Sequence, residues 1–407
     1  MHALNMPSKH AALLNNRKMD DETFKKLFPN VIPHPFVKHA YIYDKNEYDL
    51  GKSIYHLLGC FYLQEPSAMM PSFLLNPSED DILLDLCAAP GGKSIQASFL
   101  MNNKGLIISN DIARNRCDAI LENVERLGIG NIIITNNDFD LIKNNYKNTF
   151  TKIILDAPCS GSGMFRKENK MKDDWSFNKV LKYAETQKQL ILMAYDMLTD
   201  GGDMVYSTCS FSFEEDEEVI QYLLENTNAE LIDIPDNEML YKSNNLPLGV
   251  HLLPNLFPGE GHYICLIHKP GLIKKHPLKE KETSNKFKGV DIDQKLTYVQ
   301  RFGDTLFALP HPPINIKPLH IVRMGVKIGE YIKDIFKYSY HYSHYIDSFA
   351  NEIKLNDEQL EQYLKGQVLY QQSTRGYVLL IYKGVNLSFG KSDGKVIKNH
   401  FPKGLRR

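Results

Sequence analysis

Two cysteines follow predicted strands, at positions where a thiol can act as a nucleophile. Cys159 lies in DAPCSGSGMFRK (156–167) and Cys209 in STCSFSFEEDEEV (207–219), each directly after an apolar run. Open α/β sheets bind their ligands at the carboxyl ends of strands, so both thiols stand at a ligand-binding edge. A lone cysteine is more often a small buried hydrophobe. The matching placement of two favours a catalytic pair.

The segment LDLCAAPGGKS (84–94) predicts a ligand-binding turn between a strand and a helix that begins near Lys93. Its glycines let a ligand approach the backbone, and a helix N-terminus favours a carboxylate or phosphate. A phosphate-binding P-loop would need glycine at Cys87, and G-x-G-x-x-G is absent. The alternative is a tight turn without a ligand. Asp111 follows the next predicted strand, where a carboxylate can accept hydrogen bonds from ribose hydroxyls.

The elements that must position these residues alternate between strands and helices. From Asp80 to Lys269, near-continuous apolar runs are separated by amphipathic stretches such as 118–128 and 179–198. This pattern is typical of a parallel sheet covered on both faces, and it predicts a doubly wound α/β core. The predicted strands are 81–86, 105–110, 131–135, 152–156, 203–208 and 262–269.

The rest of the chain predicts smaller units on either side of this core. Residues 1–75 are mixed and should form a lead-in domain, and the Lys-, Pro- and Gly-rich stretch 270–289 is typical of a linker or surface loop. From Val290 onward we expect a β-rich unit. It should contain a hairpin turning near Gly303 and Asp304, a helix over 355–366 and strands within 376–396.

Composition places the chain among well-cored intracellular proteins. It has 407 residues, 43% of them hydrophobic, with no apolar run of the ~18 residues that a membrane helix needs. The N-terminus lacks the features of a secretory signal. Six cysteines without a CxxC pair favour free thiols in a reducing cytoplasm, with no zinc site.

The net charge of -1 hides an asymmetry between the two parts of the chain. From Tyr241 to Arg407 there are 25 Lys and Arg against 14 Asp and Glu, a net charge of +11, which leaves -12 for residues 1–240. A basic region favours a polyanionic partner, and ordinary solvated surface charge is the alternative.

The motifs CAAPGGK (87–93), DAPCSGSG (156–163) and TCS (208–210), in this order, resemble those of RNA 5-methylcytosine methyltransferases of the Sun and RsmF type. The resemblance covers nearly the whole chain. YLQEPSAMMPS (62–72) is similar to the element before their catalytic fold, and PGEGHYICLI (258–267) to the element at its end.

The tail resembles the RsmF branch, which acts on bacterial ribosomal RNA. Segment 295–330 is similar to the intermediate domain of that branch, and 387–407 to the end of its PUA-like RNA-binding domain. HYSHY (341–345) departs from the family pattern, as does Phe139 after Asp138. The resemblance implies a class I methyltransferase (Rossmann-like) core with a small N-terminal domain and a PUA-like C-terminal domain. The implied boundaries are 1–75, 76–270, 290–345 and 346–407.

The resemblance also assigns roles to individual residues. Cys209 would be the nucleophile, and Cys159 would assist release of the product. Asp156 would complete the site, hydrogen-bonded to the cytosine edge in its protonated form or through water. Protonation would need a raised pKa, which burial can supply. No metal is expected. The implied residues of the S-adenosylmethionine pocket are Cys87, Ala88, Ala89, Pro90, Gly91, Gly92, Lys93, Asp111, Arg116, Asp138 and Asp156.

The chemistry of cytosine explains why such an enzyme needs thiols. Carbon 5 is a poor nucleophile, but addition of a thiolate at carbon 6 makes the ring an enamine-like species that can attack a methyl group. The base must be unpaired or flipped to reach the pocket.

The expected substrate is RNA, with cytosines of small-subunit (16S) ribosomal RNA first, either free or in the assembled subunit. The alternatives are transfer RNA, a small molecule or protein methylated by the same fold, and an RNA-binding assembly factor without turnover. We expect a cytoplasmic monomer without a membrane partner. Six basic residues are candidates to hold the RNA backbone: Lys391, Lys395, Lys398, Lys403, Arg406 and Arg407. The alternative for these six is a solvated tail.

Overall fold

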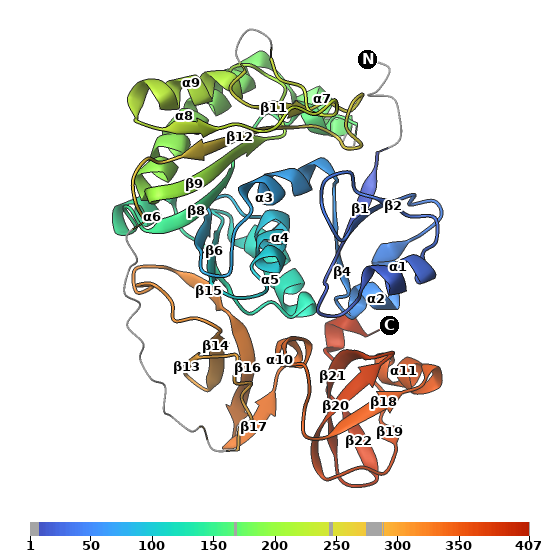
Figure 1. Ribbon diagram of the computed structural model, residues 1–407. Coiled ribbons are helices and arrows are strands. Elements are labelled where there is room, and N and C mark those ends of the chain that lie inside the picture. The colour runs from blue at the N-terminus through green and yellow to red at the C-terminus, as the bar shows by residue number, and fades with distance from the viewer. Residues whose placement is uncertain (1–7, 167–168, 244–246, 274–286, 288, 407) are drawn as a thin grey trace.

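The computed structural model describes residues 8–166, 169–243, 247–273, 287 and 289–406. Most of the predicted linker 270–289, and Arg407, lie outside these residues. The strands of the described chain form four sheets, and Figure 1 shows the largest of them at the centre of the molecule. No helix in this part of the chain is long and apolar enough to cross a membrane.

The central sheet has the order β10-β12-β9-β8-β5-β6-β7-β15, with β11 paired to β12. Strands β5 to β9 are parallel to one another, and β12 pairs antiparallel with β9. The chain moves to one side of β5 for β6 and β7 and to the other for β8 and β9, which makes the β5–β8 boundary a topological switch point. The six predicted strands are found as β5 (Ile82–Asp85), β6 (Leu106–Asn110), β7 (Ile132–Thr135), β8 (Phe150–Asp156), β9 (Leu198–Thr208) and β12 (His262–His268). The short strands β10 (Glu230–Ile232) and β11 (Val250–Leu252) complete this side.

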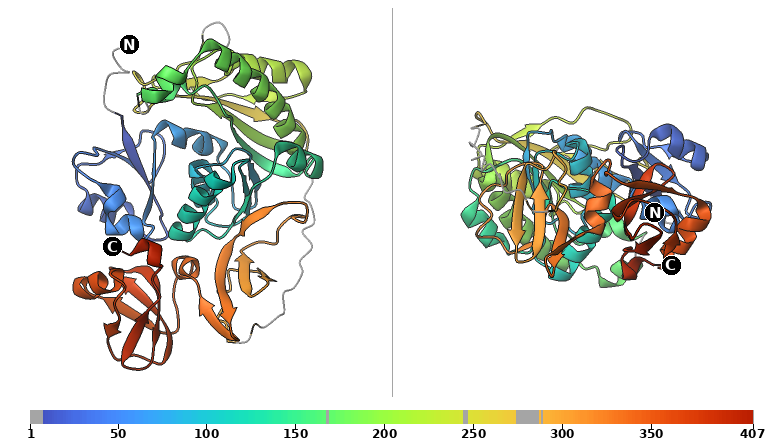
Figure 2. Two further views of the ribbon diagram at one scale, coloured as in Figure 1. Left: turned by 180° about the vertical axis from the view of Figure 1, so that it is seen from behind. Right: turned by 90° about the horizontal axis from the view of Figure 1, so that it is seen from below.

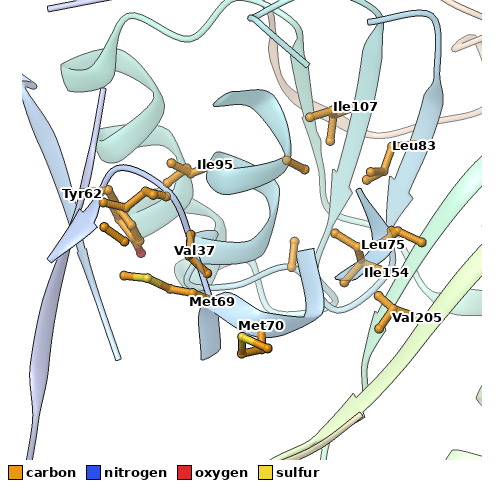
Figure 3. Packing of buried hydrophobic residues seen from close by; sticks show 14 of the residues in the cluster. Val37, Tyr62, Met69, Met70, Leu75, Leu83, Ile95, Ile107, Ile154 and Val205 are labelled. Carbon is orange, nitrogen blue, oxygen red and sulfur yellow. The ribbon is translucent and has the colours of Figure 1, made fainter. Parts of the chain in front are cut away.

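Helices cover both faces of the sheet, because alternate strand residues are apolar on both sides. Leu83, Ile107 and Ile154 pack toward α3 (Met70–Leu75), α4 (Gly92–Leu100) and α5 (Arg114–Leu127), as Figure 3 shows for part of this core. Leu84 and Ile108 pack into the opposite core with α6 (Phe139–Asn145), α8 (Phe177–Met197) and α9 (Glu217–Asn226). The predicted doubly wound α/β core is therefore confirmed. The remaining helix of this region is α7 (Asn169–Asp174).

The N-terminal unit is an antiparallel sheet with the order β2-β3-β1-β4. Its inner residues and those of the C-terminal unit form one hydrophobic cluster that includes Phe24, Phe61, Leu360 and Phe401. The N-terminal and C-terminal units therefore pack against each other, as the views in Figure 2 agree. The elements are β1 (His10–Leu14), α1 (Asp21–Leu27), β2 (Ile32–Pro33), β3 (Ala40–Tyr43), α2 (Ile54–Leu57) and β4 (Phe61–Gln64).

The segment after the linker contains the predicted hairpin and one unexpected strand. β13 (Tyr298–Phe302) and β14 (Thr305–Leu309) pair antiparallel around Gly303 and Asp304, as the sequence predicts. They continue into a sheet with β16 (Val326–Ile332) and β17 (Ile335–Tyr338). Between them, β15 (Ile321–Met324) leaves this sheet and pairs antiparallel with β7. The intermediate segment thus supplies the last strand of the central sheet.

The C-terminal unit is a five-stranded sheet with one helix. The predicted helix is α11 (Asp357–Leu364), and it begins with a capping box in which Asn356 and Gln359 exchange hydrogen bonds. The strands predicted within 376–396 are found as β20 (Gly376–Tyr382) and β21 (Val385–Ser392), and β22 (Val396–Asn399) begins at the end of that stretch. The other two strands of the sheet are β18 (Glu352–Leu355) and β19 (Leu369–Tyr370).

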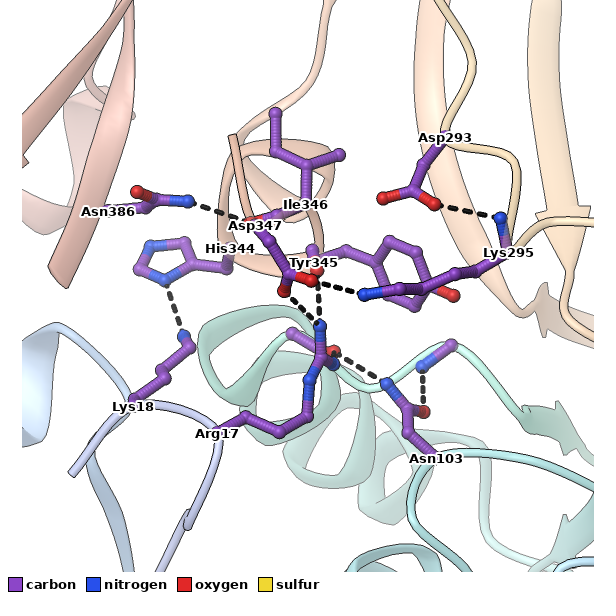
Figure 4. Close-up of polar contacts among 12 residues, drawn as sticks. Arg17, Lys18, Asn103, Asp293, Lys295, His344, Tyr345, Ile346, Asp347 and Asn386 are labelled. Atoms are coloured by element: carbon purple, nitrogen blue, oxygen red, sulfur yellow. Dashed lines mark hydrogen bonds and ion pairs between the residues drawn. The ribbon is translucent and has the colours of Figure 1, made fainter. Parts of the chain in front are cut away.

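The stretch HYSHY belongs to a short buried helix, α10 (Tyr340–Tyr345), where three parts of the chain meet. His341 Nε2 lies 2.8 Å from the carbonyl oxygen of Ile129 in the core. From the N-terminal unit, Lys18 Nζ lies 3.0 Å from His344 Nδ1, and the Arg17 guanidinium donates to the carbonyl of Tyr345 at 2.7 Å (Figure 4). We call this region the α10 junction.

Candidate active site

A cavity of about 320 Å³ lies at the carboxyl ends of β5, β8 and β9, where the end of β4 covers it. We call it the site cavity. It brings together eight of the residues predicted from the sequence: Cys87, Ala88, Ala89, Pro90, Gly92, Lys93, Asp156 and Cys209. The structure adds Tyr62, Leu63, Gln64, Glu65, Ala68, Asp85, Met164 and His262 to its wall.

The predicted turn 87–93 forms the floor of the cavity and leads into α4. Gly91 precedes the helix with φ of 103°, a backbone conformation that strongly favours glycine. Asp111 is buried and accepts a hydrogen bond from the Ala89 N–H at 3.2 Å. Arg116 donates to the Ala89 carbonyl at 2.6 Å and pairs with Asp111 at 3.2 Å. Asp111 and Arg116 therefore hold the turn in place, although neither residue lines the cavity.

Lys93 and Asp156 form an ion pair of 2.8 Å inside the cavity. Burial disfavours the charged form of Asp156, but Lys93, His262 and a hydrogen bond from Ser207 outweigh it and hold its pKa below the ordinary value. The raised pKa that a protonated Asp156 would need is therefore not found, and its predicted contact with the base through water stays a prediction. The physical reason is that Lys93 compensates the buried carboxylate.

The two cysteines come from neighbouring loops, and their sulfur atoms lie 3.0 Å apart. The hydrogen bond to Cys209, burial and the nearby charges of Cys209 and Glu215 raise the pKa of Cys159 well above its ordinary value. Cys159 therefore holds its proton and can donate it toward the Cys209 sulfur. Cys209 lines the cavity, and Cys159 is not among its lining residues.

Comparisons with known proteins agree with this geometry. Residues 72–268 match the family 16S rRNA methyltransferase RsmB/F, and residues 350–407 match the methyltransferase RsmF PUA domain. Ribosomal RNA small subunit methyltransferase F of Shewanella oneidensis is 30% identical over 98% of this chain and 91% of its own length. The protein of that name from Psychromonas ingrahamii is 32% identical over 88% of this chain and 81% of its own.

The chain belongs to the family of ribosomal RNA small subunit methyltransferase F. The resemblance predicted from the sequence, including its RsmF branch, is confirmed.

Solved structures show the same fold. A methyltransferase homolog protein from Pyrococcus horikoshii is 30% identical with a TM-score of 0.58, covering 66% of this chain and 88% of that one. NSun6 of the same organism, solved with SFG, is 21% identical with a TM-score of 0.59, covering 67% and 93%, and shows the fold alone.

The site cavity of this methyltransferase fits S-adenosylmethionine, the cofactor predicted from the sequence. Asp85 is fully buried at the end of β5, and its Oδ2 accepts a hydrogen bond from Ser94 at 2.6 Å. Its Oδ1 has no partner among the described residues. Burial, with Asp156 and Asp111 nearby, raises the pKa of Asp85 to about 7. An unpaired buried acceptor beside an open turn suits the ammonium group of the cofactor.

Glu215 is a residue of this methyltransferase that the sequence analysis missed. It is fully buried, and its carboxylate accepts hydrogen bonds from the Ser160 N–H at 2.8 Å, the Ser210 hydroxyl at 2.6 Å and the Gln187 amide at 3.1 Å. Ser160 follows Cys159 and Ser210 follows Cys209 in the chain. Glu215 therefore ties the two cysteine loops together. It could not be singled out from the sequence, because the run EEDEE (214–218) is typical of an exposed helix start.

The two flanking elements of the family pattern meet at the rim of the cavity. The Glu65 carboxylate accepts hydrogen bonds from the backbone N–H groups of Ser67, Ala68 and Glu260. His262 Nδ1 lies 3.1 Å from the Ser67 hydroxyl, and burial lowers its pKa to about 4, so the imidazole is neutral. These contacts join β4 to β12 across the opening.

Asp138 lies elsewhere. It is exposed, and its side chain caps α6 by accepting a hydrogen bond from Leu141 N–H at 2.7 Å. Its predicted place in the S-adenosylmethionine pocket stays a prediction.

A buried cluster of two acidic residues and a histidine lies at the start of α9 and on β11. Ligand-type atoms of Asp216, Glu217 and His251, all buried, are within 4.8 Å of one another, so their composition could hold a metal ion. His251 pairs with Glu217 at 2.8 Å, and Asp216 accepts a hydrogen bond from the Thr208 hydroxyl at 2.6 Å. These contacts give the group a structural role beneath the Cys209 loop.

Proposed function

We propose that this protein, as a cytoplasmic monomer, transfers the methyl group of S-adenosylmethionine to carbon 5 of cytosine in ribosomal RNA through a covalent adduct with Cys209. The observation that carries the proposal is the pair of thiols, 3.0 Å apart, of which Cys209 lines a cavity that fits the cofactor. A methyl donor alone needs no thiol, and the pair supplies what carbon 5 lacks, which is activation of the ring.

Cys209 is the attacking group because its sulfur lines the cavity. Its thiolate adds to carbon 6 of the cytosine, and carbon 5 then attacks the methyl group that the cofactor supplies. A water molecule then takes up the carbon 5 proton, and the electron pair of that carbon–hydrogen bond re-forms the double bond between carbon 5 and carbon 6. The bond between sulfur and carbon 6 breaks in the same step, and the thiolate is restored. Cys159 keeps its proton and donates a hydrogen bond to the Cys209 sulfur, which stabilises the thiolate before attack and as the leaving group.

The ion pair of Lys93 and Asp156 orients and stabilises the base. Ionised Asp156 can accept a hydrogen bond from the exocyclic amino group of cytosine, and it cannot donate one to the ring. Lys93 adds a positive charge at the same edge. A preorganised cation offsets the negative charge that thiolate addition places on the ring, most strongly in a buried site.

Ribosomal RNA is the proposed substrate because the matched relatives are named for the small ribosomal subunit. The proposed domains are the predicted units 1–75, 76–270, 290–345 and 346–407, with the last holding RNA. Lys395, Lys398 and Lys403 are exposed there, and Lys391 lies over the Tyr377 ring at 5.5 Å. Arg406 donates to the Phe401 carbonyl at 3.2 Å, which favours a structural role for it.

The test is incubation with labelled S-adenosylmethionine and separate ribosomal and transfer RNA, followed by nucleoside analysis. We expect the label in 5-methylcytosine of ribosomal RNA. Label in another nucleoside would contradict the chemistry, and label in transfer RNA alone would contradict the substrate.

The division of labour between the cysteines has its own test. Cys159→Ala removes the thiol that assists departure of Cys209, so we expect a protein–RNA adduct that survives denaturing electrophoresis. Cys265→Ala, which removes a buried thiol from β12, is the matched control and should turn over like the wild type. Normal turnover by Cys159→Ala without an adduct would contradict the assigned roles.

A further inference from the structure

A second cavity, of about 260 Å³, adjoins the site cavity on the N-terminal unit. We call it the adjoining cavity. The two share three wall residues at the end of β4, namely Leu63, Gln64 and Glu65. A polymer strand that places one base in the site cavity must continue past this rim.

The architecture of the N-terminal sheet creates the adjoining cavity. β1 pairs antiparallel with β4 so that Ala11 lies opposite Gln64, and β1 also pairs with β3 so that His10 lies opposite Tyr43. The start of β1 and the ends of β3 and β4 therefore meet beside the rim. Gly51 lines the same cavity, and its lack of a side chain leaves room there.

The charges around the adjoining cavity favour an anion. Lys9 and Lys45 line it, are exposed, and form no ion pair with the residues that the structure describes. The acidic side chains are already engaged. Asp49 pairs with Lys52 at 2.8 Å, and the Glu65 carboxylate accepts three backbone N–H groups. Two available cations beside engaged acids suit a phosphate group.

The cavity also offers ring surfaces. The rings of His10 and Tyr43 pair with their centroids 5.9 Å apart, and both residues line the wall. Tyr43 is buried in the N-terminal unit and His10 is partly exposed, so the ring that faces a base is that of His10, with Tyr43 packed against it. Aromatic rings of this kind stack with the bases of single-stranded nucleic acid. Lysines with aromatic rings, next to a site for a target base, form a combination that matches one further nucleotide.

We propose that the adjoining cavity binds the nucleotide next to the target cytosine in the RNA strand. Lys9 and Lys45 contact its phosphate, and the ring of His10, which packs against Tyr43, contacts its base. This inference rests on the proposed function, because it takes the site cavity to hold a cytosine of RNA.

The charge test is the double variant Lys9→Ala/Lys45→Ala, assayed for 5-methylcytosine formation on ribosomal RNA. We expect the KM for RNA to rise roughly tenfold, with the salt dependence of log KM reduced by about 0.7 for the one phosphate that is no longer neutralised on a single strand. The kcat and the affinity for S-adenosylmethionine should not change. The matched control is Lys26→Ala/Lys38→Ala, two exposed lysines of the same unit outside the cavity wall. An equal rise in the control would overturn the inference.

Gly51→Leu tests the space itself without changing charge. A Cβ at Gly51 meets its nearest neighbours, Asp49 Oδ1 and Leu63 Cδ1, at 3.7 Å, an ordinary contact, and the backbone there is not left-handed. We expect the KM for RNA to rise while binding of the cofactor and thermal stability stay as in the wild type.

A crosslink gives the position directly. RNA with 4-thiouridine beside the target cytosine should crosslink to the peptides that contain residues 9–10 or 43–51. If the wild type forms 5-methylcytosine but the crosslink is absent and both variants keep the wild-type KM, the subsite inference alone fails. If the wild type forms no 5-methylcytosine on any RNA, the proposed function fails instead.

Discussion

The site cavity and the α10 junction both bury ionisable side chains, with opposite results for their charge. In the cavity, Lys93 and Asp156 compensate each other and stay charged, while Asp85 keeps one oxygen without a partner. At the junction, burial lowers the pKa of Lys18 to about 7 and that of His341 to about 3. The junction side chains bond to backbone carbonyls, such as those of Leu58 and Ile129.

This difference separates two uses of buried polarity. Paired charges beside an open cavity can stabilise charge on a ligand, because they are already oriented and need no reorganisation when the ligand binds. Neutralised groups bonded to carbonyls satisfy the backbone and fix one packing arrangement. Substitutions in the cavity should therefore reduce activity more than stability, and substitutions at the junction the reverse.

The largest expected effect is at the nucleophile. Cys209→Ala should lower methylation at least about a thousandfold, because the ring can no longer be activated. Its melting temperature and its affinity for S-adenosylmethionine should stay near the wild-type values. Radiometric assay, calorimetry and thermal unfolding check the three quantities. A large loss of stability in this variant would break the distinction between the two regions.

Glu215→Gln should have the next largest effect. It keeps the shape but weakens charge-assisted hydrogen bonds worth about 2 kcal/mol, so we expect kcat to fall roughly thirtyfold with KM little changed. Glu218→Gln, a neighbouring change at a partly exposed carboxylate, is the matched control. A loss of kcat that matches only the unfolded fraction of the protein would show that Glu215 stabilises the fold without positioning the cysteines.

Cofactor affinity should depend on pH through Asp85. Because its pKa is about 7, Asp85 is largely protonated at pH 6 and must ionise to pair with the ammonium group. We expect the Kd for S-adenosylmethionine to fall roughly tenfold from pH 6 to pH 8 and then level off. In Asp85→Asn, binding should be weaker and the pH dependence flatter. Isothermal titration calorimetry at several pH values measures the Kd of both proteins. If the Kd of the variant depended on pH as strongly as that of the wild type, the titrating group would not be Asp85.

The smallest effect should appear at the junction, in stability. The pKa of Lys18 falls from 10.5 to about 7 on folding, so between these values the unfolded chain binds more protons. The free energy of unfolding should therefore rise with pH, by at most about 1.4 kcal/mol per pH unit. Lys18→Met should lose this dependence of stability on pH but keep the wild-type kcat. Lys26→Met, on the exposed face of α1, should keep the pH dependence. Denaturant unfolding at pH 7, 8 and 9 is the measurement.

The sequence predicted the elements of the core and the pairing of the cysteines, because both depend on local patterns. The parallel strands are apolar on both faces, and the two thiols follow them directly. Contacts between distant segments were not predictable in this way. The pKa of Asp156 depends on its ion pair with Lys93, which comes from another loop. No local sequence pattern predicts how close the two loops lie.

In two segments, burial differs from what residue type alone indicates. The acidic run after Cys209 is typical of solvated surface, yet Glu215, Asp216 and Glu217 are all buried. HYSHY has no apolar periodicity, yet its side chains fill the space where three units meet. In both cases tertiary partners supply the hydrogen bonds that water would otherwise provide.

The position of β15 has a consequence for synthesis of the chain. β15 covers the edge of β7, but it follows β7 far along the sequence. The edge of β7 therefore stays unpaired on the ribosome until residue 324 has emerged. An uncovered edge strand offers its N–H and C=O groups to other chains, so this nascent stage is prone to aggregation. Any shortened version that ends before Ile321 keeps that exposed edge permanently, and an isolated catalytic fragment needs β15 to cover that edge.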